Sequence, residues 1–299
     1  MQMGEYFSHQ PLDFLVLLGD RYELLPVALN ALLFGIPIIH ISGGDITEGA
    51  IDDQIRHALT KMAHVHFPGT RESADRIIRM GEEPWRICIT GELSLDAILN
   101  LRLRTKEELF ESLKLDPALS VICATFHPET IENKITPDFI NTLCLELVKE
   151  PTCQIVLTAA NADVGGYEIN TLLRTLPREN RRIHFFESLG QLNYFSLLAQ
   201  SSVVLGNSSS GIVEAKSFNV PVVDVGKRQK GRVANSNVIH ADPTVPAIVT
   251  AITCVQDGNF RERFCHERNI HGDGKAVERM MTYLKECDRS KLLAKKFIY

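Results

Sequence analysis

The stretch GNSSSGIVEAKSFNVPVVDV, residues 206–225, places glycines, serines and one glutamate between two apolar runs. Residues 202–205 and 220–225 predict buried strands, and residues 211–218 predict a helix between them. The hydroxyls therefore stand where a helix begins, at a point that presents unpaired N–H groups and a partial positive charge. Such a helix start is a natural seat for a phosphate.

The same alternation of apolar runs and amphipathic segments extends over most of the chain. Apolar runs that predict strands are DFLVLLGD, IPIIHIS, HVHFP and WRICITG in a first series, and LSVICATF, CQIVLTA, RIHFFES, SVVLGN and VPVVDV in a second. Buried strands that alternate with helices are typical of parallel sheets. We therefore predict an α/β protein of two Rossmann-type, doubly wound domains, over residues 1–115 and 116–299.

The first domain is expected to be incomplete. Its first strand, residues 13–18, starts close to the amino end, and a doubly wound nucleotide domain usually has more strands than the few visible here. One or two strand–helix units, each about 30 residues long, are therefore expected before Met1. The second domain is expected to end in a helix.

Composition argues against several classes of partner. The chain has 299 residues, a net charge of −5 and a pI of about 6.1, which argues against nucleic acid. No apolar run approaches the ~20 residues that a membrane span needs. The seven cysteines are dispersed without a CxxC pair, and the amino end lacks a signal-peptide pattern. These features indicate a cytoplasmic protein with reduced thiols and no membrane partner.

Polar and glycine-rich segments follow the predicted strands at their carboxyl ends, where open parallel sheets bind ligands. They are LGDR and HISGGD in the first domain, and TFHPE, TAANAD, GNSSSG and GKRQKGR in the second. Packing alone does not explain such a collection, so we expect a ligand cleft between the two domains. The chain has no GxGxxG and no GxxxxGK[ST] motif, which argues against NAD and ATP.

The candidates in the second domain fit a nucleoside diphosphate. Ser208 and Ser209 can bind a phosphate, although serine serves equally well as a helix N-cap. Glu214 can accept both hydroxyls of a ribose, or can simply suit the positive end of the helix. Arg228 lies in a basic loop that can neutralise a diphosphate, although charged loops are usually only solvated. Together these residues favour a nucleoside diphosphate over a dinucleotide.

Carboxylates supply candidates in the first domain. Asp20 ends a strand and can be catalytic or a simple N-cap. Asp52 begins a helix four residues before Arg56, and Asp53 stands four residues before His57. Residues four apart share a helix face, so at least one of these two pairs is expected to be a plain ion pair.

Histidines give one candidate ligand residue and one weaker alternative. His127 stands at a predicted strand end, before Pro128, where a histidine seldom serves packing. His64 and His66 alternate within a strand and could suggest a metal. Because no third ligand stands at metal spacing, we predict no metal site.

Several segments of the chain carry a family resemblance: LGDR, HISGGDITEGAIDDQIRHALTKMAH, FHPET, and GNSSSGIVEA followed by GKRQKGR. Together they resemble the hydrolysing UDP-N-acetylglucosamine 2-epimerases, in particular the branch that feeds sialic acid synthesis. The likeness covers nearly the whole chain, and the block of residues 43–64 is its most specific part. Related enzymes of this branch act on a bacillosamine-type UDP-sugar and make precursors of legionaminic acid.

The resemblance implies a GT-B-like fold that binds a UDP-sugar between two Rossmann-type domains. It also implies a reaction in which UDP-N-acetylglucosamine (UDP-GlcNAc) and water give N-acetylmannosamine and UDP. Such enzymes eliminate UDP across C1 and C2 and then hydrate the glycal with inversion at C2. No cofactor is implied, and a homo-oligomer, either a dimer or a tetramer, is expected.

Residue roles follow from the resemblance position by position. The catalytic residues that we assign are Asp20, Asp52, Asp45 and His127. The residues that we assign to UDP-sugar binding are Arg21, Arg56, Asn161, Asp163, Ser208, Ser209, Glu214 and Arg228.

Two features depart from the family pattern. Many relatives carry an acidic residue two places after the histidine of HIS, where this chain has Ser42, which leaves Asp45 as the alternative second carboxylate. The amino-terminal strand and loop that supply a substrate-binding arginine are expected to be absent. A GT-B glycosyltransferase and an inactive UDP-sugar-binding remnant therefore stay open as alternatives, beside an epimerase for a bacillosamine-type substrate.

Overall fold

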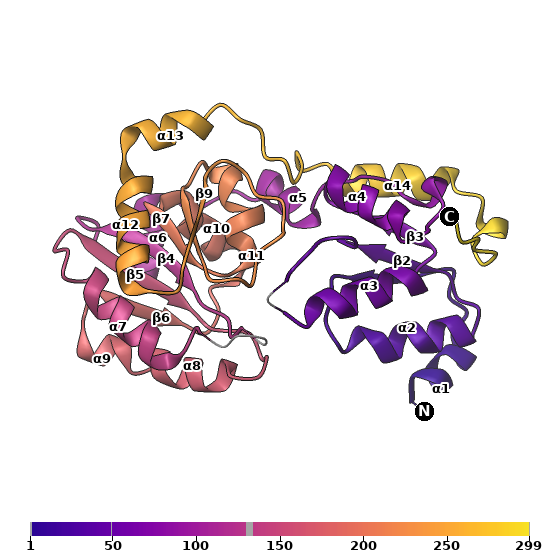
Figure 1. Cartoon of the computed structure of the whole chain (residues 1–299), viewed down its shortest axis with the longest axis horizontal. Coiled ribbons are helices and arrows are strands. Elements are labelled where there is room, and N and C mark those ends of the chain that lie inside the picture. The colour runs from indigo at the N-terminus through magenta and orange to yellow at the C-terminus, as the bar shows by residue number, and fades with distance from the viewer. Residues whose placement is uncertain (1, 49, 130–133, 299) are drawn as a thin grey trace. The chain divides into compact units, whose positions relative to one another are not determined.

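The structure is a computed structural model that describes residues 2–48, 50–129 and 134–298 (Figure 1). Residue 49 and the last residue of the FHPET motif therefore lie outside the described residues.

Contacts divide the chain into two compact units, each with its own parallel sheet. Unit 1 comprises residues 1–47, 51–99 and 270–299, and unit 2 comprises residues 48–50 and 100–269. The α/β class with two parallel-sheet units is therefore confirmed.

Unit 1 holds a three-stranded parallel sheet in the order β1-β2-β3. Its strands are β1 (Leu15–Leu18), β2 (Ile38–Ile41) and β3 (Val65–Phe67). The N–H of Gly19 donates to the carbonyl of Ile41 at 3.1 Å, so β1 and β2 end side by side. Residues that follow these two strands are thereby held at one edge of the sheet.

The run WRICITG, predicted as a strand, is not a regular one. It begins with a 3₁₀ turn, η1 (Pro84–Arg86), and a single parallel bridge joins Ile87 to His66. Pro84 suits the first position of a helical turn and has no N–H to give to a ladder. The chain still follows β3, because the N–H of Cys88 donates to the carbonyl of His66 at 3.0 Å.

One helix of unit 1 comes from the far end of the chain. The helices of this unit are α1 (Gln2–His9), α2 (Leu24–Leu33), α3 (Asp52–Met62), α4 (Arg71–Arg79), α5 (Leu93–Asn100) and α14 (Ala276–Glu286), with the short η3 (Arg289–Lys291). Ala276 and Met280 of α14 join the core cluster of Ile39 and Ile41. The predicted terminal helix therefore exists, but it belongs to unit 1 and not to the second domain, because its apolar face covers the sheet of unit 1.

Unit 2 holds a six-stranded, all-parallel sheet in the order β6-β5-β4-β7-β8-β9. The strands are β4 (Ser120–Thr125), β5 (Cys153–Thr158), β6 (Ile183–Phe186), β7 (Val203–Gly206), β8 (Val222–Val225) and β9 (Val238–Ala241). The sequence analysis predicted the first five of these strands and missed β9. This edge strand is only half-buried, so it lacks the continuous apolar run that marks a central strand.

The helices of unit 2 cover its sheet. They are α6 (Lys106–Leu113), α7 (Pro137–Leu147), α8 (Gly166–Leu173), α9 (Leu176–Glu179), α10 (Gly190–Gln200), α11 (Ser209–Val213), α12 (Val245–Gln256) and α13 (Gly258–Phe264). The predicted helix at 211–218 is in fact α11 followed by a 3₁₀ turn, η2 (Ala215–Phe218). Asn219 then takes a left-handed conformation that ends the turn.

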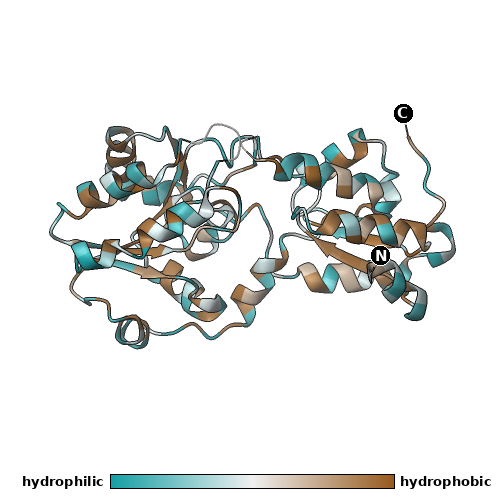
Figure 2. Ribbon diagram, turned by 90° about the horizontal axis from the view of Figure 1, so that it is seen from below, coloured by the Kyte–Doolittle hydropathy of each residue, from teal (hydrophilic) through white to brown (hydrophobic). Residues whose placement is uncertain are grey.

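Hydropathy follows this layout. In Figure 2 many helices carry both brown and teal, as amphipathic helices do. Ile38, Val65, Ile155 and Val203 in the sheets are fully buried. Among the described residues, no helix is long and apolar enough to cross a membrane.

The carboxyl-terminal segment is bound to unit 1 by buried charges. The Arg86 guanidinium is fully buried and donates to the carbonyls of Leu292 at 2.8 Å and Ala294 at 3.2 Å. Lys295 pairs with the buried Glu82 at 2.8 Å. Burial raises the pKa of Glu82, but hydrogen bonds from His66, Lys295 and Lys61 outweigh it and lower the pKa to about 2. The segment is therefore an integral part of unit 1.

Replacing Arg86 by Leu should lower the free energy of unfolding by about 2–4 kcal/mol, because buried carbonyls of the terminal segment lose their donor. Urea denaturation followed by circular dichroism would measure this change. Arg71→Leu is the control, since Arg71 pairs with Asp75 on an exposed helix face and should cost less than about 1 kcal/mol. Equal losses in the two variants would contradict the buried clamp.

Candidate active site

The strand order of unit 2 reverses between β4 and β7, because the chain builds β4-β5-β6 to one side and β7-β8-β9 to the other. Such a reversal is the usual ligand position in an open parallel sheet. Thr125 pairs with Gly206 in the register, so the loops that carry His127 and Ser208 leave the sheet at the same level. A Cβ at Gly206 would lie 1.9 Å from the carbonyl oxygen of Thr125, so only glycine permits this close approach.

Asn207, which the sequence analysis did not single out, joins the loops at this point. Its Oδ1 accepts the N–H of His127 at 2.7 Å, and its Nδ2 donates to the His127 carbonyl at 2.9 Å. Its own carbonyl accepts from Gln229 Nε2 at 3.0 Å and from Arg228 Nη1 at 3.4 Å. The side chain is fully buried. An amide directly before the serine run was the only signal that the sequence offered.

The ring of His127 is held in one tautomer. Its Nδ1 accepts the N–H of Asn161 at 3.0 Å, so the ring proton of the neutral form lies on Nε2. Burial, followed by the positive charge of Arg228, lowers the pKa of His127 to about 3. The imidazole is therefore neutral near pH 7 and offers an N–H donor, which suits a negatively charged oxygen and does not suit a general base.

The serine loop combines a cap with exposed hydroxyls. Ser208 is the N-cap of α11, because its Oγ accepts the N–H of Ser210 at 3.4 Å. The capping interpretation of Ser208 is thus confirmed, while its role toward a phosphate stays a prediction. Ser209 is exposed at the first turn, and Glu214 is the partly buried C-cap of the same helix. Ser210 Oγ lies 2.8 Å from the hydroxyl of Tyr194.

A pocket of about 500 Å³ is lined by the loop that follows β5, including Asn161 and Asp163. The Asn161 side chain donates to the Asp163 carboxylate. Since the N–H of Asn161 also binds the ring of His127, this loop and the His127 loop are joined directly. The structure therefore brings His127, Asn161, Asp163 and Arg228 into one connected network in unit 2.

In unit 1, Arg56 organises the predicted carboxylates. Its side chain is almost fully buried and pairs with the Asp20 carboxylate. It also donates to the carbonyl of Asp45 at 3.0 Å and to Thr47 Oγ1 at 3.2 Å, and it lies 3.5 Å from Asp53. In this geometry Arg56 holds the Asp20 carboxylate in place. The contact of Arg56 with substrate, which the resemblance implies, stays a prediction.

His40 holds the loop that carries Asp20. Its Nε2 lies 2.8 Å from the carbonyl of Gly19, to which it donates, and its Nδ1 lies 3.1 Å from Thr60 Oγ1. Burial lowers the pKa of His40 to about 4, so the ring stays neutral and keeps both hydrogen bonds at pH 7. The end of β1 is thereby tied to α3.

The other acids of unit 1 have different surroundings. Asp45 is buried and accepts the Ser73 hydroxyl of α4 at 2.5 Å. Asp52, at the first turn of α3, is also buried. Asp53 lies 3.5 Å from His57, so these two residues meet on the helix face as their i,i+4 spacing predicted. Burial lowers the pKa of His57, so the contact joins a carboxylate to a neutral ring near pH 7.

A further carboxylate lies at the same sheet edge and was missed in the sequence analysis. Glu92 is buried, and its Oε2 accepts the hydroxyl of Ser42 at 2.7 Å. Ser42 directly follows β2, while Glu92 follows the segment that runs beside β3. No local sequence pattern around Glu92 predicted its contact with Ser42.

No metal site is evident in the part of the chain that the structure describes, where no group of three or more His, Cys, Asp or Glu could hold an ion. His64 Nδ1 instead accepts the N–H of Ile38 at 3.0 Å, and His66 Nε2 lies 3.1 Å from Glu82 Oε2. These two histidines therefore serve packing and hydrogen bonding.

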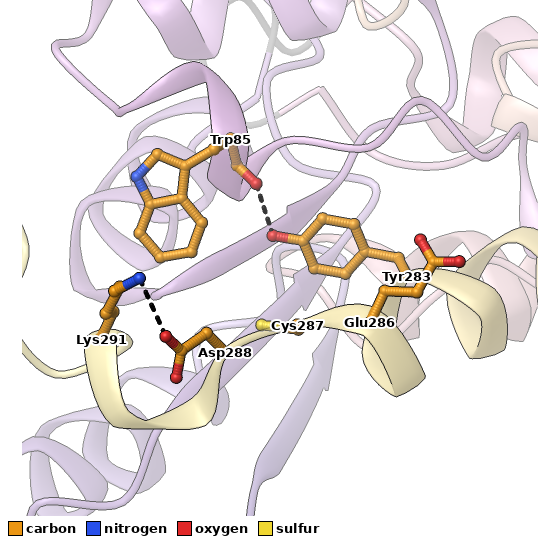
Figure 3. A pocket seen from close by; sticks show the side chains of 6 residues that line it. All are labelled: Trp85, Tyr283, Glu286, Cys287, Asp288 and Lys291. Carbon is orange, nitrogen blue, oxygen red and sulfur yellow. Dashed lines mark hydrogen bonds and ion pairs between the residues drawn. The ribbon is translucent and has the colours of Figure 1, made fainter.

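A second pocket, of about 420 Å³, has none of the predicted site residues in its lining (Figure 3). It is lined by Trp85, Tyr283, Glu286, Cys287, Asp288 and Lys291. Figure 3 shows the hydroxyl of Tyr283 turned to the carbonyl of Trp85, to which it donates at 2.6 Å, and Lys291 paired with Asp288. The first contact joins α14 to η1, and the second lies within η3 and its N-cap. Neither involves a predicted site residue.

The predicted site residues fall into two groups. Unit 1 holds Asp20, Arg21, Asp45, Asp52 and Arg56, and unit 2 holds His127, Asn161, Asp163, Ser208, Ser209, Glu214 and Arg228. Within its unit, each group lies at or near the carboxyl ends of parallel strands or the helix starts that follow them.

Comparison with known proteins gives one family. A family model described as UDP-N-acetylglucosamine 2-epimerase matches residues 1–285. A GDP/UDP-N,N'-diacetylbacillosamine 2-epimerase (hydrolyzing) of Campylobacter jejuni is 37% identical over 290 residues, covering 96% of this chain and 74% of the relative. Polysialic acid biosynthesis protein P7 of Escherichia coli is 33% identical, covering 96% of this chain and 73% of the relative.

Solved structures agree on the fold. A crystal structure of UDP-GlcNAc 2-epimerase from Neisseria meningitidis bound to UDP-GlcNAc matches with a TM-score of 0.83 at 20% identity, covering 96% of this chain and 80% of that chain. The predicted GT-B-like fold class is thereby confirmed.

The lowered pKa of His127 predicts that its ring stays neutral during acidification. Between pH 8 and pH 4.5, ¹⁵N NMR of the ring should show the Nε2–H tautomer without titration. Its contribution to stability should be complete above pH 6.5 and should decline as pH falls from 6.5 toward 3, since only the unfolded chain binds the proton there.

His240 is the internal control, because its hydrogen bond to the Asp224 carboxylate raises the pKa of His240. Its ring should titrate above pH 6.5 in the same spectra. A His127 ring that titrates together with His240 would contradict the assigned neutral donor.

Proposed function

The chain belongs to the UDP-N-acetylglucosamine 2-epimerase family, and we propose that it is a hydrolysing 2-epimerase of a UDP-N-acetylhexosamine. The observation that carries this function furthest is the neutral Nε2–H donor of His127, set beside a serine loop and a basic loop at the strand-order reversal of unit 2. This arrangement fits a diphosphate that must leave with its negative charge.

The proposed reaction has two stages. In the first, the bond between C1 and the diphosphate breaks, UDP leaves with the electron pair, and a base removes the proton from C2 to give a glycal. In the second, water adds its oxygen to C1 and C2 receives a proton on the opposite face. The C2 proton is not acidic, since no carbonyl is attached to that carbon, so departure of UDP has to lead.

The residues of unit 2 suit the leaving group. His127 donates to a diphosphate oxygen, Arg228 supplies positive charge, and Ser208 and Ser209 complete the cradle. Glu214 accepts the ribose hydroxyls. Preorganised donors of this kind stabilise charge that develops on UDP as C1–O cleavage proceeds.

Asn161 and Asp163 are assigned to the sugar-nucleotide through the loop that holds the ring of His127. Because this loop sets the tautomer of His127, changes in the loop are expected to alter diphosphate binding as well as sugar contacts.

The residues of unit 1 suit proton transfer. We assign Asp20 as the base that removes the C2 proton, held in place by Arg56, and Asp52 as the acid that returns a proton to C2. Arg21, partly exposed after β1, is assigned to the substrate. The contact of Asp45 with Ser73 of α4 favours a positioning role for Asp45 over the catalytic role that the resemblance implied.

The names of the relatives give two candidate substrates, and sequence similarity favours one over the other. The Campylobacter jejuni relative is named for GDP/UDP-N,N'-diacetylbacillosamine, and the Neisseria meningitidis structure holds UDP-GlcNAc. The first relative is the more similar in sequence, so the diacetylated sugar is tested beside UDP-GlcNAc. We also propose a cytoplasmic homo-oligomer, which size-exclusion chromatography with light scattering would test.

Incubation with UDP-GlcNAc or UDP-N,N'-diacetylbacillosamine in heavy water should release UDP and a 2-epimerised sugar that carries deuterium at C2, because the new C2 proton comes from solvent. Proton NMR measures both products. Sugar transfer that requires an added acceptor would instead indicate a glycosyltransferase. Tight binding of an intact UDP-sugar without turnover would indicate a binding module.

Asp20→Asn should lower kcat by about 100-fold or more while the Kd for UDP changes by less than about threefold, because the change removes a base and no diphosphate contact. Glu214→Ala should weaken UDP binding by about 10- to 100-fold through loss of the ribose pair. Calorimetry and steady-state kinetics measure the two effects.

Asp13→Asn is the matched control for Asp20, since Asp13 is exposed and pairs with Arg289 on the surface of the same unit. Full activity in Asp20→Asn would show that another group is the base.

A further inference from the structure

Resting on the proposed function, we propose that Ser42 and Glu92 form a proton relay that takes the proton from the water that adds to C1. The geometry joins a hydroxyl at the end of β2 to a buried carboxylate at the end of the neighbouring segment, 2.7 Å apart. Neither residue belongs to the set that the sequence analysis assigned.

The pair stands beside the proposed base. The N–H of Gly19 donates to the carbonyl of Ile41, so Ser42 and Asp20 follow neighbouring parallel strands. Neighbouring strands lie about 4.8 Å apart. Ser42 and Asp20 therefore stand at the same edge of the sheet, at the ends of neighbouring strands.

The surrounding backbone is built around the carboxylate of Glu92. A Cβ at Gly69, in the loop after β3, would lie 2.2 Å from Glu92 Oε1. The N–H of Glu92 donates to the carbonyl of His271 at 2.7 Å, and the N–H of Ser42 donates to the carbonyl of Phe67 at 3.0 Å. Both ends of the pair are thus fixed by main-chain contacts.

Ser42 is held in a costly conformation. Its φ is +59°, in the left-handed region that favours glycine. The other described non-glycine residues with positive φ, Lys114 and Asn219, are C-caps where that conformation ends a helical turn. Ser42 follows a strand and caps no helix. A serine at a position where glycine would relieve the backbone strain points to a use for its hydroxyl.

The relay balances in protons. As the water oxygen bonds to C1, the water proton passes to Ser42 Oγ, and the Ser42 hydroxyl proton passes to Glu92 Oε2. Asp52 supplies the proton that C2 receives and takes up another from solvent. Protonated Asp20 and protonated Glu92 return their protons to solvent, so all three carboxyl groups are reset after the product leaves. Removal of the C2 proton by Asp20 in the first stage does not use the relay, so the two stages can be separated by substitution.

Glu92→Gln separates catalysis from structure. The glutamine carbonyl can still accept the hydroxyl of Ser42 and fills the same volume, but it cannot take a proton at neutral pH. In heavy water, NMR should show UDP and the unsaturated glycal in place of the 2-epimerised sugar, with kcat for the sugar about 100-fold lower and KM within threefold. Glu278→Gln, an exposed change on α14, is the control and should match the wild type.

Ser42→Gly provides the second variant. Glycine accepts a φ of +59°, and the relief of backbone strain offsets part of the cost of losing the hydrogen bond to Glu92, so the variant should stay folded. It should nevertheless release glycal as Glu92→Gln does. The double variant should be no slower than the slower single variant, because both changes break one relay.

A normal product ratio and kcat in Ser42→Gly or in folded Glu92→Gln would overturn the relay, as would losses that multiply in the double variant. A wild-type enzyme that releases no UDP from either UDP-sugar would overturn the proposed function itself. The two failures are therefore distinguishable in one set of spectra.

Discussion

The paired hydrogen bonds between the Asn207 side chain and the backbone of His127 are the contact on which the candidate site of unit 2 depends. They fasten the loop after β4 to the loop after β7, at the one place where the strand order reverses. Because the groups are buried, loss of the amide would leave polar atoms without partners at a cost of roughly 1–3 kcal/mol each. The tautomer of His127 is set by a separate contact, the N–H of Asn161 in the loop after β5.

Unit 1 positions its polar groups with charge where unit 2 uses an amide. Arg56 is a buried cation with acceptors from Asp20, Asp45 and Thr47, and each acceptor compensates part of the cost of burying it. The result is a fixed carboxylate at a sheet edge. Unit 2 presents a fixed ring N–H donor at its strand ends, and unit 1 presents fixed carboxylates at the ends of its own strands.

The site could be predicted only in part because its groups are joined over long separations in sequence. The serines, Glu214 and His127 stood out, since each follows an apolar run in a short motif. Asn207 and His127 are 80 residues apart, and Ser42 and Glu92 are 50 apart. A hydrogen bond between residues so far apart in sequence produces no periodicity and no characteristic spacing that a local sequence pattern could reveal. Glu92 looks like any glutamate before a helix until Ser42 is seen beside it.

The sequence by itself determined the α/β class, because strands buried on both faces of a parallel sheet must be continuous apolar runs. It also placed the polar candidates at the carboxyl ends of those runs. Only the tertiary structure decided the strand order, the irregular path of WRICITG, the place of α14 in unit 1 and the pairing of Ser42 with Glu92. Packing and hydrogen bonding between segments that are distant in sequence decide those features. The local sequence pattern around a residue does not indicate which distant residue it will contact.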